Sequence, residues 1–195
     1  EILPEDGRSV TVVGTRKSTA YGREVAHQIA GDLARNSVAI VSGLPRGIDA
    51  IAHRAALEAG GRTLAVLANG LDTVYPPEHA SMAQEICQRG ALISEHPPGI
   101  RPEARNFPRR NRILSGLTQG TVVVEAGETS GALITARHAI EQDREAFAVP
   151  GNIFSPSSRG TNRLIRDSAA KLVVDYRDVL EELNISSAGG QLEMT

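Results

Sequence analysis

Short apolar runs alternate with helix-periodic stretches along the chain. The runs are rich in Val, Ile, Leu and Ala, and the stretches between them repeat apolar residues at helical spacing, as Val25, Ile29 and Leu33 do. We predict strands over residues 10–13, 38–41, 63–67, 91–94, 121–124, 145–149 and 171–174. We predict helices over residues 22–36, 48–59, 78–88, 131–142, 161–167 and 175–184, and a further helix that begins near Arg109.

The strand segments are continuously apolar, which indicates strands that are covered on both faces. Because they alternate with helices, we predict an α/β fold with a doubly wound, mostly parallel sheet in a single domain. Residues 1–9 are polar and are expected to be a lead-in, residues 10–185 the domain, and residues 186–195 a disordered tail. The chain begins with Glu1 rather than Met, so we expect it to be a piece of a longer protein.

One glycine turn stands out, Ser42-Gly43-Leu44-Pro45-Arg46-Gly47-Ile48-Asp49, between a predicted strand and a predicted helix. Glycines let a ligand come close to the backbone, and a helix start offers unpaired N–H groups at the positive end of the helix dipole. The pattern is typical of an anion site, most naturally one for phosphate. A plain strand-to-helix turn with a surface arginine is the alternative. Similar turns end other strands, at residues 14–16, 127–131 and 150–151, on the side of the sheet where ligands bind.

A second distinctive stretch is Phe107-Pro108-Arg109-Arg110-Asn111-Arg112, within a segment of five arginines and one glutamate between residues 101 and 112. Arginine forks match phosphate oxygens, and arginines at a helix start are unfavourable without an anion. A solvated or salt-bridged surface is the alternative. Asn111 is expected either to bond a base edge or to hold backbone, and for Phe107 we favour a core position over base stacking.

Two carboxylates, Glu95 and Glu125, follow predicted strands on the ligand side of the sheet. They are candidates for acid–base roles, but we favour the alternative that they orient backbone N–H groups and arginines. Asp49 and His53 share a helix face, where capping and a hydrogen bond are favoured over a metal site because two ligands do not suffice. We therefore expect no metal, no cofactor and no catalytic residue.

Composition narrows the classes further. There is no Trp and aromatic residues make up 3% of the chain, which argues against an aromatic platform as the main way of holding bases. The net charge is −2, so any contact with nucleic acid depends on local clusters of arginine. The single cysteine, Cys87, permits no internal disulfide, and neither a Walker A sequence nor the G-x-G-x-x-G fingerprint is present. Without an apolar run of membrane-spanning length, a soluble cytoplasmic protein with no membrane contact is expected.

An ordered set of motifs resembles the DNA-processing protein A family (DprA, also called Smf), from about Val12 to Val174. The set comprises Val13-Gly14-Thr15-Arg16, Tyr21-Gly22, the octet at residues 42–49 with Ala52-His53, Gly70-Leu71-Asp72, Tyr75-Pro76, Ser94-Glu95, Phe107 to Ile113, Val124-Glu125-Ala126 with Ser130-Gly131, Val149-Pro150-Gly151, and Gly160-Thr161-Asn162.

The resemblance implies an extended Rossmann-like domain that binds single-stranded DNA. Such proteins protect incoming DNA during natural transformation and load the RecA recombinase on it, usually as dimers. Carried over by position, the DNA pocket consists of Ser42, Gly43, Arg46, Gly47, Arg109, Arg110, Asn111 and Arg112, followed by Arg16, Lys17, Gly127, Ser130 and Gly131. We place the dimer contact in the C-terminal segment, with Leu172, Val174, Leu180 and Leu183 as candidates.

The alternative function is a nucleotide hydrolase of the same fold. Nucleotide phosphoribohydrolases resemble this chain around Glu125 but carry Pro-Gly-Gly-x-Gly-Thr in the following turn. This chain has Ala126-Gly127-Glu128-Thr129-Ser130-Gly131 there, which does not fit that pattern. We therefore favour a DNA-binding protein that is not an enzyme.

Overall fold

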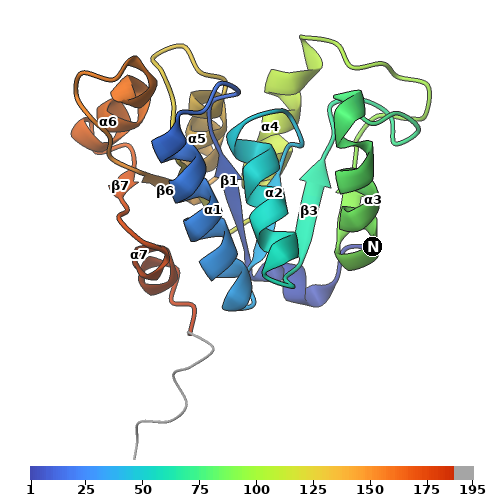
Figure 1. Cartoon of the computed structure of the whole chain (residues 1–195), viewed down its shortest axis with the longest axis horizontal. Coiled ribbons are helices and arrows are strands. Elements are labelled where there is room, and N and C mark those ends of the chain that lie inside the picture. Colours follow the sequence, from blue (N-terminus) through green and yellow to red (C-terminus); the bar gives the residue numbers. More distant parts are fainter. Residues whose placement is uncertain (187–195) are drawn as a thin grey trace, which may run out of the picture.

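A computed structural model describes residues 1–186, and residues 187–195 of the predicted tail lie outside the described residues. Seven strands form one sheet in the order β4-β3-β2-β1-β5-β6-β7, and every pairing is parallel (Figure 1). The strands are β1 (Ser9–Val13), β2 (Ala39–Ser42), β3 (Thr63–Val66), β4 (Ala91–Ile93), β5 (Gly120–Val123), β6 (Glu145–Ala148) and β7 (Lys171–Leu172). The predicted doubly wound α/β fold is confirmed.

The order of strands reverses between β1 and β5. From β1 the chain moves outward through β2 and β3 to β4, and it then returns to pair β5 with the other side of β1. Val12 lies beside Val122 at this junction. In open parallel sheets the loops separate at such a switch point, which leaves a crevice beyond the carboxyl ends of the strands.

Helices cover both faces of the sheet. In Figure 1, α1, α2 and α3 lie in front of the sheet, and α4 and α5 lie behind it. The α-helices are α1 (Ala20–Arg35), α2 (Ile48–Glu58), α3 (Ala80–Arg89), α4 (Asn106–Gly116), α5 (Ala132–Glu141), α6 (Arg159–Arg166) and α7 (Tyr176–Glu182). Short 3-10 turns are η1 (Pro4–Gly7), η2 (Pro77–His79) and η3 (Pro156–Ser158).

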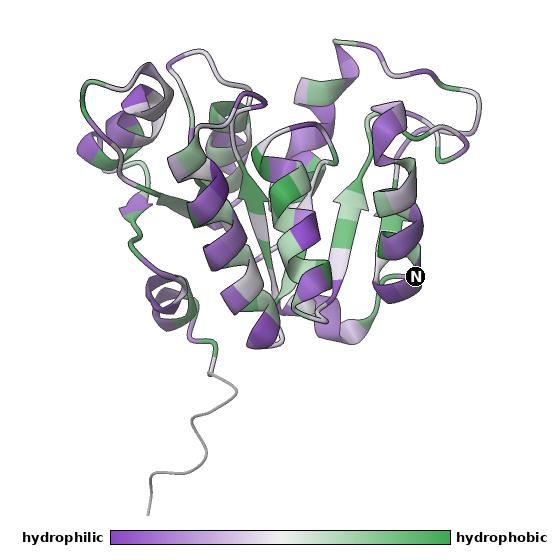
Figure 2. Cartoon of the chain, in the orientation of Figure 1, coloured by the Kyte–Doolittle hydropathy of each residue, from purple (hydrophilic) through white to green (hydrophobic). Residues whose placement is uncertain are grey.

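Alternate side chains of the central strand enter different cores, because successive residues of a strand point to opposite faces. Val10 and Val12 pack with Leu33 on the side of α1 and α2. Val13 packs with Leu114 on the side of α4 and α5. Figure 2 shows the strands and the inward helix faces in green, with purple concentrated on outer helix surfaces. Within the described residues, no helix combines the length and the apolar character needed to cross a membrane.

Two predicted boundaries differ from the structure by two or three residues. Helix α4 begins at Asn106 rather than near Arg109, because Pro108 fits within the first turn, where its missing N–H is not needed. The strand predicted over 171–174 is the two-residue β7. The earlier start of α4 moves Arg110 out of the first turn, so the helix-dipole argument made for the arginine cluster applies less directly to it.

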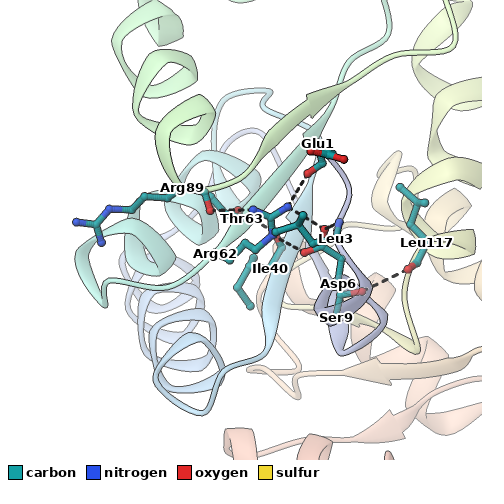
Figure 3. Close-up of polar contacts among 9 residues, drawn as sticks. All are labelled: Glu1, Leu3, Asp6, Ser9, Ile40, Arg62, Thr63, Arg89 and Leu117. Carbon is teal, nitrogen blue, oxygen red and sulfur yellow. Dashed lines mark hydrogen bonds and ion pairs between the residues drawn. The ribbon is translucent and has the colours of Figure 1, made fainter.

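The lead-in is fixed to the sheet rather than separate from it. Asp6 of η1 is buried and accepts hydrogen bonds from the Arg62 Nη2 atom at 2.9 Å and from the Leu3 N–H at 2.8 Å (Figure 3). Ser9, assigned to the lead-in by the sequence pattern, is the first residue of β1. This segment closes the amino-terminal edge of the sheet, opposite the crevice.

Candidate nucleic-acid interface

A cleft of about 670 Å³ opens at the switch point between β1 and β5. Its walls come from the loop at residues 14–16, the loop before α4, the start of α4 and the turn at residues 127–131. The glycine turns after β1 and β5 and the arginine-rich stretch, which are far apart in sequence, therefore meet at one place. Arg16, Arg110, Asn111 and the turn residues Gly127, Ser130 and Gly131 all line the cleft.

The loop after β1 is locked to the start of α2. The Ile48 N–H donates to the Thr15 carbonyl at 3.2 Å, and the Thr15 N–H donates to the Glu125 carbonyl at 2.7 Å. Gly47 has a φ of +87°, and a Cβ at this position would lie 2.3 Å from the Thr15 carbonyl oxygen. Only glycine fits this approach, because L-residues avoid that φ and no space remains.

The predicted anion site at the start of α2 needs correction as a result. The Ile48 N–H, which was expected to face a ligand, is used by Thr15. Asp49 in the first turn of α2 also accepts from the Gly43 N–H at 3.2 Å and from the Gly14 N–H at 3.4 Å. Burial raises the pKa of Asp49, and the charge of Arg110 and these hydrogen bonds oppose that rise. The carboxylate therefore uses two backbone N–H groups of the glycine turns within the fold.

Ser42 and Gly43 are buried and bonded within the fold, so they are not surface contacts. The Ser42 hydroxyl donates to the Val12 carbonyl at 2.6 Å. Gly43 lies between Asp49 and Arg110, and a Cβ there would lie 2.4 Å from the Arg110 guanidinium. Both residues shape the loop from within, which corrects their predicted role as direct contacts.

Arg110 is the clearest departure from the predicted site. Its side chain is 3% exposed, and its Nη1 atom donates to the Gly43 carbonyl at 2.9 Å and to the Val66 carbonyl. Burial lowers the pKa of Arg110 to about 10, while the charge of Asp49 opposes that change. The guanidinium stays charged near neutral pH and joins α4 to the loops after β2 and β3. It is a structural tie and not an exposed phosphate ligand.

Asn111 and the turn after β5 form the opposite wall. The Asn111 Nδ2 atom donates to the Gly131 carbonyl at 3.3 Å, so of its two expected roles the structure favours holding backbone. The Ser130 N–H donates to the Gly127 carbonyl at 3.1 Å, and the Ser130 carbonyl accepts from the Leu133 N–H at 3.1 Å. The hydroxyl of Thr135, in the same wall, is buried and has no hydrogen-bond partner among the described residues.

Glu125 and Glu95 follow strands β5 and β4. Both hold neighbouring groups in place, which is the role that we favoured from the sequence. The buried Glu125 carboxylate accepts from the Thr19 N–H at 2.9 Å and from the Thr19 hydroxyl at 2.7 Å, which fixes the start of α1. Burial and the nearby charge of Glu125 raise the pKa of Tyr21. Glu95 pairs with Arg112.

Two aromatic rings and an arginine form one wall of the cleft. The Arg16 guanidinium carbon lies 5.1 Å from the centroid of the Phe107 ring, and the Tyr75 ring lies 6.0 Å from Phe107 at an angle of 56°. All three residues line the cleft, and Tyr75 is exposed. The core position favoured for Phe107 is therefore wrong. Sequence reasoning did not propose Tyr75 as a site residue, and the only signal for it was its place in the Tyr75-Pro76 motif.

The remaining predicted cations are exposed around the cleft. Arg46 pairs with Glu78 at 2.5 Å on the surface, while Lys17 and Arg109 have no ion pair among the described residues. Arg109 and Arg112 line a second recess of about 640 Å³, which adjoins the cleft at Pro108. Arg46, Arg109 and Arg112 thus lie outside the cleft, whereas Arg16 lines it.

His53 is a core residue. Its Nδ1 atom lies 2.7 Å from the Thr63 hydroxyl, which itself donates to the Ile40 carbonyl, so Nδ1 carries the proton in this pair. Burial lowers the pKa of His53 to about 3, and the charge of Arg110 adds to this effect. The hydrogen bond favoured between Asp49 and His53 on the helix face is wrong, because His53 bonds Thr63 of β3 while Asp49 accepts from the Gly43 and Gly14 N–H groups.

The dimer candidates divide into two groups. Leu180 is 4% exposed and belongs to the core beside α1, and Leu183 packs against the same core. They hold α7 to the domain, so their assignment to an interface needs correction. Leu172 and Val174 are exposed and remain candidates.

Comparisons with known proteins agree with this geometry. The family described as DNA recombination-mediator protein A matches residues 1–184. DNA processing protein DprA of Bacillus subtilis is 45% identical over 181 residues, which cover 93% of this chain and 61% of the relative. Protein Smf of Escherichia coli is 49% identical over 175 residues, which cover 89% of this chain and 46% of the relative. The chain therefore spans about half to three fifths of these relatives.

Solved structures extend the comparison. DprA from Streptococcus pneumoniae superposes with a TM-score of 0.84 at 40% identity, covering 91% of this chain and 62% of that one. DprA from Helicobacter pylori, described with a single-stranded DNA binding mode, superposes with a TM-score of 0.83 at 30% identity. The match covers 91% of this chain and 80% of that one. A molybdenum cofactor carrier protein from Chlamydomonas reinhardtii shares the fold alone, at 16% identity and a TM-score of 0.61. That match covers 91% of this chain and 98% of the carrier protein. The resemblance seen in the motifs is confirmed, and this chain belongs to the DNA recombination-mediator protein A family.

Proposed function

We propose that this chain binds single-stranded DNA across the carboxyl edge of its sheet. The observation that carries the proposal is the wall of the cleft formed by Arg16, Phe107 and Tyr75. One guanidinium group and two aromatic rings there line the same cleft. Aromatic rings stack on any base, and arginines contact the phosphates between them. A duplex keeps its bases stacked inside, so this combination favours a single strand.

The phosphates are assigned to the exposed cations and not to the buried ones. Arg16, Lys17, Arg46 and Arg109 are exposed around the cleft, and Arg112 lies in the adjoining recess. The unpartnered Thr135 hydroxyl supplies a further polar group in the wall. Because these groups read the backbone and the faces of bases, we expect little sequence preference.

The family resemblance and the relatives' names support a wider role in DNA processing. We propose that the protein acts in the cytoplasm, protects incoming DNA and loads the RecA recombinase on it during transformation and recombination. We further propose a homodimer that uses the exposed Leu172 and Val174. Light scattering at micromolar concentration tests the dimer, and a monomer would contradict it.

The experiment for DNA binding is fluorescence anisotropy with labelled oligo-dT over a range of salt concentrations. Arg16→Ala should weaken binding by about tenfold and reduce the slope of log affinity against log salt by about 0.7, the value for one phosphate on a single strand. The control is Arg35→Ala, which removes the same charge at the far end of α1, where Arg35 pairs with Asp32.

Two outcomes would overturn the proposal. If Arg35→Ala weakens binding as much as Arg16→Ala, the attraction is diffuse and the cleft is not the site. If wild-type protein binds no strand at low salt, the family assignment does not extend to this function. Conversion of AMP to adenine by the same preparation would then support the nucleotide hydrolase alternative.

A further inference from the structure

The loop after β6 exposes two large apolar side chains. Phe154 is 83% exposed and Ile153 is 75% exposed, the highest values among large hydrophobic residues in the described part of the chain. Keeping an aromatic ring in water costs hydrophobic free energy, and such exposure commonly marks a contact site. Neither residue belongs to the cleft described above.

The loop is held in place by its own hydrogen bonds. The Phe154 N–H donates to the Asn152 Oδ1 atom at 2.8 Å, and the Ser155 N–H donates to the Asn152 carbonyl at 2.9 Å. Asn162 of α6 exchanges two bonds with the backbone of Gly151, at 3.0 and 2.9 Å. The ring is therefore presented on an ordered turn, which lowers the entropy cost of using it in binding.

This turn adjoins the wall of the cleft. The Gly160 N–H donates to the Ala126 carbonyl at 2.8 Å, and Pro156 packs against Gly127. In Figure 1, α6 lies at the same edge of the sheet as the starts of α1 and α4. A DNA strand that leaves the cleft over the turn at residues 127–131 would therefore reach the loop of Phe154 next.

A second aromatic residue, Tyr21, lines a shallow recess next to the loop of Phe154. Tyr21 is half exposed, and its hydroxyl donates to the Pro150 carbonyl at 2.7 Å. The recess has a volume of about 590 Å³ and is lined by Tyr21, Pro150 and the two residues that flank Ile153 and Phe154, namely Asn152 and Ser155.

Cations accompany these rings. Lys17 and Arg23 are exposed just before and within the first turn of α1, and Arg159 is exposed at the first residue of α6. The Arg23 Nη1 atom donates to the Ser18 carbonyl at 2.8 Å, which keeps its charge at this edge. Exposed aromatic rings interleaved with cations are the pattern of single-strand binding surfaces.

We propose that Phe154 and Tyr21 form a second base-stacking site, which extends the DNA path from the cleft across the loop after β6. The inference rests on the proposed function and adds Phe154, which neither the motifs nor the cleft includes, and the recess beside Tyr21, which lies outside the cleft. One base stacks on the Phe154 ring, the recess beside Tyr21 takes an adjacent base, and Lys17 and Arg159 contact the phosphates.

The chain contains no Trp, so Phe154→Trp creates a single intrinsic fluorophore at the proposed site. Titration with oligo-dT of about 16 nucleotides, the upper length for single-strand sites, should quench the emission of this introduced indole as anisotropy reports binding. The matched control is Ile140→Trp, which places the fluorophore at an exposed apolar position near the end of α5 that leads away from the cleft. Its emission should not change.

Affinities for long and short DNA strands distinguish binding at this second site from binding in the cleft. Phe154→Ala should raise the Kd for the long strand by about 5- to 10-fold, the lower part of the range for base–aromatic stacking, because one side of the ring faces water. Phe154→Tyr should bind like wild type, and Phe154→Leu, which keeps apolar area without a ring, should bind like Phe154→Ala. Strands of about 4 nucleotides, the lower limit for single-strand sites, should bind all variants equally through the cleft.

If DNA binds but the emission of the Phe154→Trp variant is unchanged, the second site is overturned while the proposed function stands. Unchanged long-strand affinity in Phe154→Ala leads to the same conclusion. If wild-type protein binds no DNA, both proposals are overturned.

Discussion

Arg62 at the amino-terminal edge of the sheet and Arg16 at the carboxyl edge have different kinds of partner. At the amino-terminal edge, Arg62 donates to the Asp6 carboxylate at 2.5 and 2.9 Å and to the Glu1 carbonyl at 2.7 Å (Figure 3). At the carboxyl edge, Arg16 lies over the ring of Phe107, and Arg109 has no carboxylate partner among the described residues. Arg62 is paired within the fold, whereas Arg16 and Arg109 have no carboxylate partner among the described residues.

Arg110 shows that position at the carboxyl edge does not decide this behaviour. Its guanidinium is bound within the fold as firmly as that of Arg62, because it donates to two backbone carbonyls and lies near Asp49. The difference between structural and binding arginines is therefore one of burial and partners. This comparison separates the arginine cluster into Arg110, which shapes the site, and exposed neighbours, of which Arg109 has no ion pair among the described residues and Arg112 pairs with Glu95.

The largest expected effect comes from Arg110→Met. The substitution keeps much of the side-chain volume but leaves the Gly43 and Val66 carbonyls without their donor and Asp49 without its nearby cation. We expect a loss of about 3 kcal/mol in the free energy of unfolding, the cost of removing one partner from a buried charged network. Urea denaturation followed by circular dichroism measures it.

The matched change is Arg109→Met, one residue earlier on α4 and exposed. We expect it to leave stability within about 0.5 kcal/mol of wild type and to weaken DNA binding. The comparison between the two arginines fails if Arg110→Met unfolds at the wild-type urea concentration and loses only DNA affinity.

The next largest expected effect concerns the amino-terminal edge, where the free energy of unfolding should depend on pH. Burial by itself raises the pKa of Asp6, but hydrogen bonds from Arg62 and Leu3 and the charge of Arg62 lower it on balance. The ionised form therefore stabilises the fold at pH values above 3.8, and this stabilisation is lost as pH falls through the lowered pKa. Asp6→Asn should cost about 1.5 kcal/mol at pH 7, the contribution of a charged hydrogen bond.

Unfolding by urea between pH 2 and pH 7 measures the difference between wild type and Asp6→Asn. The two proteins should converge at the acid end, where Asp6 is protonated, and DNA affinity at pH 7 should be equal. A constant difference across the whole range would show that the carboxylate charge contributes nothing and that Arg62 is held by backbone contacts alone.

The architecture followed from the sequence because its causes are local. Continuous apolar strands and helical periodicity determine a doubly wound sheet, and glycine turns mark its ligand edge. Gly47 is an example, since its positive φ is required by a turn that the motif already indicated. The motifs also predicted which loops meet, because parallel strands bring their carboxyl ends to one edge.

The roles of individual side chains within the site did not follow in the same way. Arg109, Arg110 and Arg112 belong to one arginine-rich stretch, but only Arg110 lies on the buried face of α4, four residues before Leu114. The earlier start of α4 at Asn106 likewise exposes Phe107 to the cleft beside Tyr75, which comes from a distant loop. Such long-range packing has no periodic signal in the chain.

The smallest expected effect concerns Arg46, which is neither buried like Arg110 nor, like Arg109, without an ion pair among the described residues. Arg46 is exposed at the carboxyl edge but pairs with Glu78. A backbone hydrogen bond lowers the pKa of the Glu78 carboxyl, and the hydrogen bond and charge of Arg46 lower it further. A phosphate must displace this carboxylate, so Glu78→Gln should raise DNA affinity by a small factor at low salt, and the gain should vanish at high salt, where exposed pairs are screened. Glu85→Gln, which removes the partner of Arg54 on α3, is the control and should leave affinity unchanged. Anisotropy with oligo-dT measures both, and weaker binding by Glu78→Gln would mean that Glu78 positions Arg46 for the strand, making this pair a structural one like that of Arg62.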